Sequence, residues 1–103
     1  MSPSAVCVIF KTKPGKRDEL KGAWEKHIKP HVMGNEDIVQ NIYNFSIDDP
    51  DTVCMFEVLS DIKVLSDAYE QSWMKEYLGV IGPLLAGTPQ VLRLNPLWMK
   101  NRV

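Results

Sequence analysis

Tyr69 and His27 are the side chains of this sequence best suited to hold or accept a proton during a reaction. A phenol hydroxyl can donate a hydrogen bond to a developing oxyanion, and an imidazole commonly serves as a general base near neutral pH. Tyr69 lies four residues before Trp73, which places both on one face of a helix. We therefore predict an aromatic cavity in which Tyr69 and His27 are catalytic and Trp73 forms a wall, although the same spacing is typical of core residues.

The other predicted substrate-binding residues come from the helix of Tyr69, from an earlier helix and from two strands: Leu65, Trp24, Tyr43, Asn44 and Phe56. Asn44, like Asn41, could donate a hydrogen bond to a bound oxygen or could belong to the edge of the sheet ladder. Glu57 stands inside an apolar strand, where an unpaired carboxylate is costly. We predict a structural ion pair between Glu57 and Arg93 at a dimer interface.

The sequence predicts no metal and no cofactor. His27 and His31 are four residues apart, but Pro30 disturbs their spacing and no HExxH pattern accompanies them. Cys7 and Cys54 lack the CxxC spacing of a metal or redox motif, so we interpret both as small buried hydrophobic residues. The chain contains no GxGxxG pattern for a flavin or nicotinamide.

The elements that position these residues alternate between strand and helix patterns. The predicted strands are residues 5–11, 38–47, 52–59 and 90–95, and the predicted helices are residues 17–29 and 62–77, the second capped by Ser60 and Asp61. Gly79, Gly82 and Pro83 should interrupt any further helix, either as a fixed turn or as a lid. The order βαββαβ predicts an α+β, ferredoxin-like fold: a four-stranded antiparallel sheet with two helices on one face.

Length and composition predict one globular domain of 103 residues, with a core at 5–95 and a tail at 96–103. A net charge of -1 disfavours nucleic-acid binding, which needs clustered cations. No apolar run is long enough to span a membrane, and no signal peptide is apparent. We therefore expect a cytoplasmic protein that binds neither nucleic acid nor membrane.

The second face of the predicted sheet should also be covered. The strands at 5–11 and 52–59 are apolar at nearly every position, whereas a solvated sheet face would alternate with polar residues. We predict a homodimer in which two copies pack through this face. The tail, which carries Leu97, Trp98 and Met99, could close over the partner.

Several segments together resemble the antibiotic biosynthesis monooxygenase (ABM) superfamily. They are KPGKRDEL at the first helix, FE in the third strand, the acid-started helix with Ser72, and LLAGTP before the last strand. The resemblance extends over residues 6–94. It implies a small ferredoxin-like domain that dimerises through its sheet into an α+β barrel.

The resemblance also implies a range of activities. Some members oxidise phenols or quinols with molecular oxygen and no cofactor, some degrade haem, and some have no known reaction. A histidine commonly stands three residues before a Ser or Thr on the second helix, and here Tyr69 stands three residues before Ser72. The Asn and His that haem degradation would require are absent from the first strand and the second helix. We therefore expect a cofactor-independent monooxygenase of a small aromatic phenol or quinol, or alternatively a non-catalytic dimeric ligand-binding or stress-response domain.

Overall fold

The computed structural model describes residues 2–100, so Met1 and the last three residues of the predicted tail lie outside the described range. Its strands are β1 (Ser4–Lys11), β2 (Ile38–Phe45), β3 (Thr52–Leu59) and β4 (Gln90–Leu94). Its helices are α1 (Arg17–His27), α2 (Lys29–Met33), α3 (Lys63–Tyr69), α4 (Ser72–Ile81) and the 3₁₀ turn η1 (Gly82–Leu84). The predicted order is confirmed. The first predicted helix ends two residues early, at His27, and is followed by the short α2, whereas the second predicted helix is split into α3 and α4.

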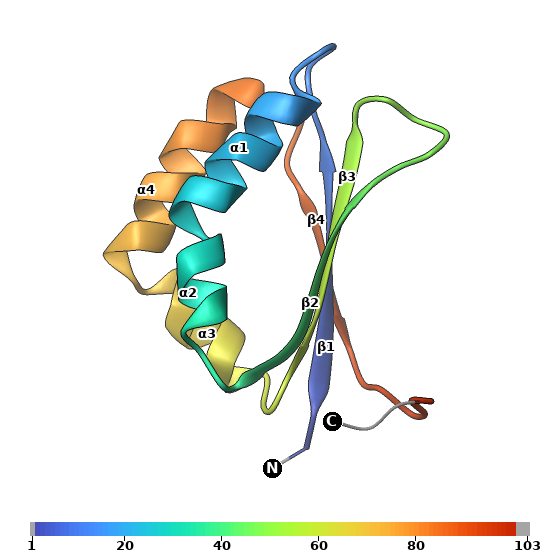
Figure 1. Ribbon diagram of the computed structural model, residues 1–103, viewed down its shortest axis with the longest axis vertical. Helices are drawn as coiled ribbons and strands as arrows, with labels where there is room; N and C mark the ends of the chain where they lie inside the picture. The colour runs from blue at the N-terminus through green and yellow to red at the C-terminus, as the bar shows by residue number, and fades with distance from the viewer. Residues whose placement is uncertain (1, 101–103) are drawn as a thin grey trace.

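The four strands form one antiparallel sheet in the order β2-β3-β1-β4. All four helices lie on the same side of this sheet (Figure 1). Because side chains alternate along a strand, one set of strand residues faces the helices and the other set faces away. The α+β, ferredoxin-like prediction is confirmed by this arrangement.

The core lies between the sheet and the helices. Val6, Val53 and Leu59 project from the sheet and pack with Leu20 of α1 and Ile81 of α4, and all five are almost completely buried. Contacts of α1 with α4 fix the two longer helices against each other. At the other end of the helical layer, the shorter α2 and α3 lie over the sheet (Figure 1), and residues of both helices line a cavity there.

The turn between β2 and β3 sets the register of this hairpin. The Asp49 carboxylate accepts hydrogen bonds from the Asp51 amide and the Thr52 hydroxyl, each at 2.9 Å, and also contacts the Lys11 ammonium. The hydrogen bond from Lys11 lowers the pKa of Asp49 to about 2. Because β2 and β3 are then paired residue by residue, Asn41 lies directly opposite Glu57.

The prediction of one continuous helix over residues 62–77 is wrong. Its start is as expected, since the Asp61 carboxylate accepts a hydrogen bond from the Lys63 amide at 2.9 Å. However, α3 ends at Tyr69, and Gln71 has an extended backbone (ψ 144°) before α4 begins. The Gln71 amide instead bonds back to the Ala68 carbonyl at 3.1 Å, closing a tighter turn. The predicted interruption at Gly79, Gly82 and Pro83 comes at Gly82, because α4 continues through Gly79 to Ile81 and the 3₁₀ turn η1 follows.

No helix of the described residues covers the opposite face of the sheet (Figure 1). Ile42, Leu92 and Leu94 are large apolar side chains that remain exposed there. Cys7 and Cys54 belong to the same face, and their Sγ atoms lie 3.0 Å apart as free thiols. Burial, together with the Cys7 thiol, raises the pKa of Cys54 to about 11. We call this surface the open face.

None of the helices in residues 2–100 combines the length and apolar character that crossing a bilayer requires.

Candidate functional site

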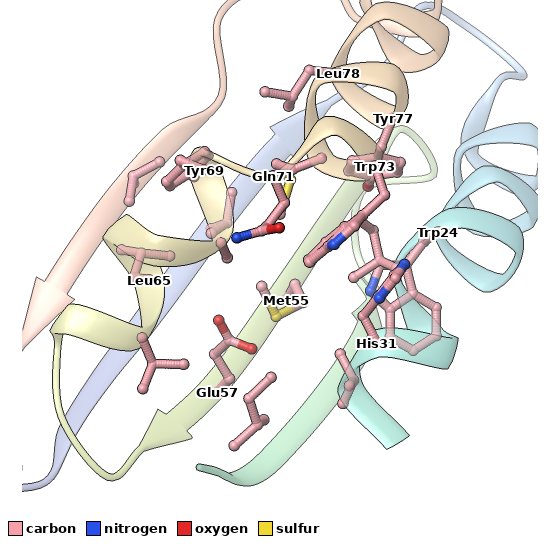
Figure 2. Close-up of a pocket in the computed structure, with 18 of the residues that line it drawn as sticks. Trp24, His31, Met55, Glu57, Leu65, Tyr69, Gln71, Trp73, Tyr77 and Leu78 are labelled. Atoms are coloured by element: carbon pink, nitrogen blue, oxygen red, sulfur yellow. The ribbon is translucent and has the colours of Figure 1, made fainter. Parts of the chain in front are cut away.

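A cavity of about 510 Å³ lies between the helix side of the sheet and the shorter helices. Its volume is in the range of pockets that bind small molecules. Val8, Met55 and Val91 form apolar parts of its floor on three strands. The helices supply mainly aromatic and aliphatic walls, to which Trp24, Ile28, Leu65, Tyr69, Trp73, Met74, Tyr77 and Leu78 contribute (Figure 2).

Glu57 is the buried acid of this cavity, with 8% of its surface exposed. It lies on β3, in phase with Met55, and projects towards the helices (Figure 2). The Asn41 side-chain amide donates a hydrogen bond of 2.9 Å to its Oε2 atom. Burial raises the pKa of Glu57, and the bond from Asn41 opposes that rise. The site therefore holds a carboxyl group that retains a proton more readily than an exposed glutamate.

Tyr69 closes the α3 side of the cavity at the last residue of that helix. Its side chain is 39% exposed, so it reaches both the cavity and the surface. Partial burial and the negative charge of Glu57 raise the pKa of Tyr69. The hydroxyl consequently keeps its proton and can serve as a hydrogen-bond donor to a bound molecule.

Trp73 and His31 form the opposite wall as a stacked pair. Their ring centroids lie 3.8 Å apart, and the two planes differ by only 10°. Trp73 comes from the second residue of α4 and His31 from α2, so the stack joins the two halves of the helical layer (Figure 2). The break between α3 and α4 positions Tyr69 and Trp73 independently, which one straight helix would not do.

The structure brings four of the predicted site residues to this cavity: Tyr69, Trp73, Trp24 and Leu65. Tyr43 lies behind the wall, where its ring packs on Trp24 with centroids 4.6 Å apart. His27 is on α1, with its ring centroid 6.4 Å from that of Tyr77, and does not line the cavity.

Phe56 and Asn44 lie on the open face, so the prediction that they line the same cavity as Tyr69 is not met. The reason is strand alternation: Phe56 follows Met55 and precedes Glu57, both of which face the helices. The Asn44 amide bonds instead to the Ile42 and Cys54 carbonyls, at 3.2 and 3.0 Å.

The cavity also contains Glu57 and His31, to which sequence reasoning gave other roles. The predicted ion pair of Glu57 with Arg93 does not form in the described part of the chain, because β1 separates the two strands and Asn41 is the partner. Glu57 lies two residues after Met55 and four after Val53, and this spacing in the sequence already indicated that the three side chains share one face of the sheet. The two histidines diverge, since α1 ends between them.

Within residues 2–100, no group of three or more His, Cys, Asp or Glu side chains is arranged to hold a metal ion. The cavity itself offers apolar surface, aromatic faces and one buried carboxyl group. That combination suits a small aromatic molecule carrying a hydroxyl group, which could bond to Glu57 or to Tyr69.

No known protein family and no curated protein matches the sequence. Solved structures do match it: a Mycobacterium tuberculosis protein aligns at a TM-score of 0.83 and 23% identity, covering 97% of this chain and 100% of its own. A Caulobacter crescentus protein named "putative antibiotic biosynthesis monooxygenase" aligns at a TM-score of 0.84 and 18% identity, covering 94% of this chain and 92% of its own. A protein of the same name from Nitrosomonas europaea has a TM-score of 0.83 and 14% identity, with 93% and 91% covered.

At these identities the likeness establishes a shared fold, whereas function depends on the residues of each site. The resemblance drawn from the sequence segments is thereby confirmed at the level of the fold.

Proposed function

We propose that this chain belongs to the ABM superfamily and is a cofactor-independent monooxygenase that oxidises a small aromatic phenol or quinol with molecular oxygen. The observation that carries the proposal is a mainly apolar cavity that contains a buried carboxyl group and a tyrosine hydroxyl. The fold shared with proteins of the ABM name supports it.

The reaction requires the substrate to supply the electrons. Loss of the hydroxyl proton gives a phenolate, which transfers one electron to oxygen and leaves a phenoxyl radical beside superoxide. Combination at a ring carbon forms a hydroperoxide once a proton returns. Cleavage of its O–O bond with loss of the hydrogen on that carbon releases water, so phenol and oxygen become quinone and water.

The cavity residues fit distinct roles in this sequence. Glu57 accepts the hydroxyl proton and returns it to the peroxide. Burial raises the pKa of Glu57 toward that of the substrate hydroxyl, which makes the carboxylate a better proton acceptor. Tyr69 donates to the substrate oxygen as negative charge develops there. Trp73, fixed by His31, holds the ring. His27 stands outside the cavity and takes no direct part.

The alternative function is a non-catalytic binding domain that retains a small apolar ligand in the same cavity. Tyr69 favours this alternative, because it occupies the position where the resemblance leads us to expect a histidine. The two functions differ in oxygen consumption, since a binding domain would take up ligand stoichiometrically and use none.

The proposed active form is a cytoplasmic homodimer joined through the open face. Exposed Ile42, Leu92 and Leu94 provide apolar surface there. Trp98 in the tail is 80% exposed, and large exposed apolar side chains often mark interaction surfaces. A second copy would bury both surfaces.

Oxygen uptake by metal-stripped protein with a panel of polycyclic phenols and hydroquinones tests the proposal, after subtraction of each compound's autoxidation. We expect saturable uptake that falls on the order of 10- to 100-fold in Tyr69→Phe, because a transition-state donor is lost. Tyr43→Phe is the matched control, since that hydroxyl does not line the cavity. Stoichiometric binding without uptake would reject the monooxygenase in favour of the binding domain.

A further inference from the structure

The charged groups around the cavity have predominantly one sign. Three carboxylates contribute to its lining: Glu57 on the floor, with Asp37 and Asp67 further out. No lysine or arginine is among the described residues that line it, and His31 is its one basic side chain. A chain with 12 Lys and Arg residues and 13 Asp and Glu residues has thus placed almost no positive charge at this site.

The two arginines of the described residues, Arg17 and Arg93, do not line the cavity. Arg17 packs over the Phe45 ring at 4.1 Å and donates to the Ser46 and Asp49 carbonyls at 2.9 and 3.0 Å. Arg93 shares the helix side of the sheet with Glu57 but stands two strands away and does not line the cavity. Neither is positioned to neutralise an anion beside Glu57.

The Glu57 carboxyl group is held in place by a hydrogen bond from Asn41. Asn41 occupies Oε2 from the neighbouring strand, and the pairing of β2 with β3 fixes that contact. Figure 2 shows the carboxyl group projecting into the cavity from the floor, below the side chain of Gln71. A ligand that donates a hydrogen bond can therefore reach this group, whereas a ligand carboxylate would meet it as a like charge.

The aromatic side chains that line the cavity also disfavour anionic ligands. The faces of tryptophan and tyrosine rings carry partial negative charge, which attracts cations and disfavours anions. Trp73, Tyr69, Trp24 and Tyr77 all contribute to the lining. The stack of His31 on Trp73 holds the imidazole flat against the indole, at 3.8 Å between centroids.

We propose that this cavity selects its ligands by charge: it accepts aromatic molecules bearing a neutral or cationic hydrogen-bond donor for Glu57, and it excludes aromatic acids and phosphates. The inference rests on the cavity being the ligand site of the proposed function, but it does not depend on turnover. It narrows the substrate class to uncharged phenols and amine-bearing aromatic compounds.

Three probes of one shape test the selection by isothermal titration calorimetry at pH 7.5: 2-naphthol, (2-naphthylmethyl)ammonium and 2-naphthoate. We expect naphthol and the ammonium to bind, and naphthoate to bind on the order of 30- to 100-fold more weakly than naphthol, from charge repulsion at a partly buried site. In Glu57→Gln, naphthoate should bind only a few-fold more weakly than naphthol. In Glu57→Asp, which keeps the negative charge, the full difference in affinity between naphthoate and naphthol should remain.

Two further variants define where the effect originates. Asp67→Asn, at the outer part of the cavity, should reduce the penalty only slightly, because solvent screens that carboxylate. Asp18→Asn, on the exposed side of α1, should leave all three affinities unchanged.

Naphthoate binding as tightly as naphthol, or an unchanged penalty in Glu57→Gln, would overturn the inference. Failure of all three probes to bind would overturn both the inference and the proposed function. Charge selection without oxygen uptake would leave the inference standing and reject the monooxygenase alone.

Discussion

On the helix side of the sheet, Val6, Val53 and Leu59 are 0–1% exposed, whereas on the open face Ile42, Leu92 and Leu94 are 38–48% exposed. The first set comes from the central strands β1 and β3 and the second from the edge strands β2 and β4, and the two sets have similar hydrophobicity. On the open face near the start of β1, by contrast, Ala5 and Val58 are buried. The difference shows that one sheet can present an internal core and an external apolar surface at once.

The two faces also differ in their polar groups. The helix side carries Glu57, paired with Asn41 and open to a cavity, while the open face carries the two close thiols. A buried carboxyl group needs a hydrogen-bond partner, and Asn41 on the neighbouring strand provides one. Thiols can be covered by another apolar surface at little cost. In our proposal, the ligand binds on the helix side of the sheet and the dimer forms through the open face.

The largest expected effect is on stability, from truncation of the internal core. Leu20→Ala should lower the free energy of unfolding by about 2–5 kcal/mol, because Leu20 is completely buried between α1 and the sheet. Leu92→Ala on the open face is the matched control and should cost far less in the separated monomer. Urea denaturation of both variants, followed by circular dichroism, gives the comparison.

Equal losses from the two leucines, at a protein concentration where the chain is monomeric, would contradict the distinction between the faces.

The second effect is on association through the open face. Leu92→Glu places a charge among exposed apolar side chains and should convert the proposed dimer into a monomer at micromolar concentration, since burying an unpaired charge is costly. Size-exclusion chromatography with light scattering measures the mass. Ile47→Glu is the control, because Ile47 is 99% exposed in the β2–β3 turn and lies off the sheet face.

A wild-type mass of one chain, or a dimer that persists in Leu92→Glu, would remove the role given to the open face.

The smallest effect concerns the pH dependence contributed by Glu57. Burial raises its pKa above that of the unfolded chain, so the folded state binds this proton more tightly. Its contribution to stability is therefore present below about pH 4, the unfolded value, and declines as pH rises through the folded pKa. Glu57→Gln should become more stable than wild type as pH rises from 4 to 8, by less than the Leu20→Ala effect.

Thermal melts from pH 4 to pH 8 measure this difference, with Glu36→Gln as an exposed control. A constant gap between Glu57→Gln and wild type across that range would show that the carboxyl group is not perturbed by its burial.

The strands were predictable to within a few residues because runs such as AVCVIF and VCMFEVL are bounded by strong turn residues. The hairpin followed in the same way from Asp48 to Asp51. The end of α3 at Tyr69 was not predictable, since no glycine or proline marks residues 69–72 and the turn depends on backbone bonds to Ala68 and on packing. Propensity alone extends a helix through such a segment.

The candidate site was predictable in part. Helical spacing, which is a local pattern, predicted that Tyr69, Trp73, Trp24 and Leu65 face the sheet, and all four line the cavity. Phe56 and Asn44 were assigned to that space by residue type, and strand alternation places both on the other face. His31 lies just beyond the predicted helix at 17–29, and it lines the cavity because the short α2 forms at residues 29–33, which the sequence did not predict.

The sequence by itself determined the order of elements, the antiparallel hairpin and the presence of two apolar sheet faces, all of which follow from local propensity and periodicity. The tertiary structure alone decided that Asn41 meets Glu57, that His31 stacks on Trp73 and that a cavity remains beneath the short helices. These contacts join residues 16 and 42 positions apart along the chain. They depend on strand register and helix placement, which the whole molecule fixes together.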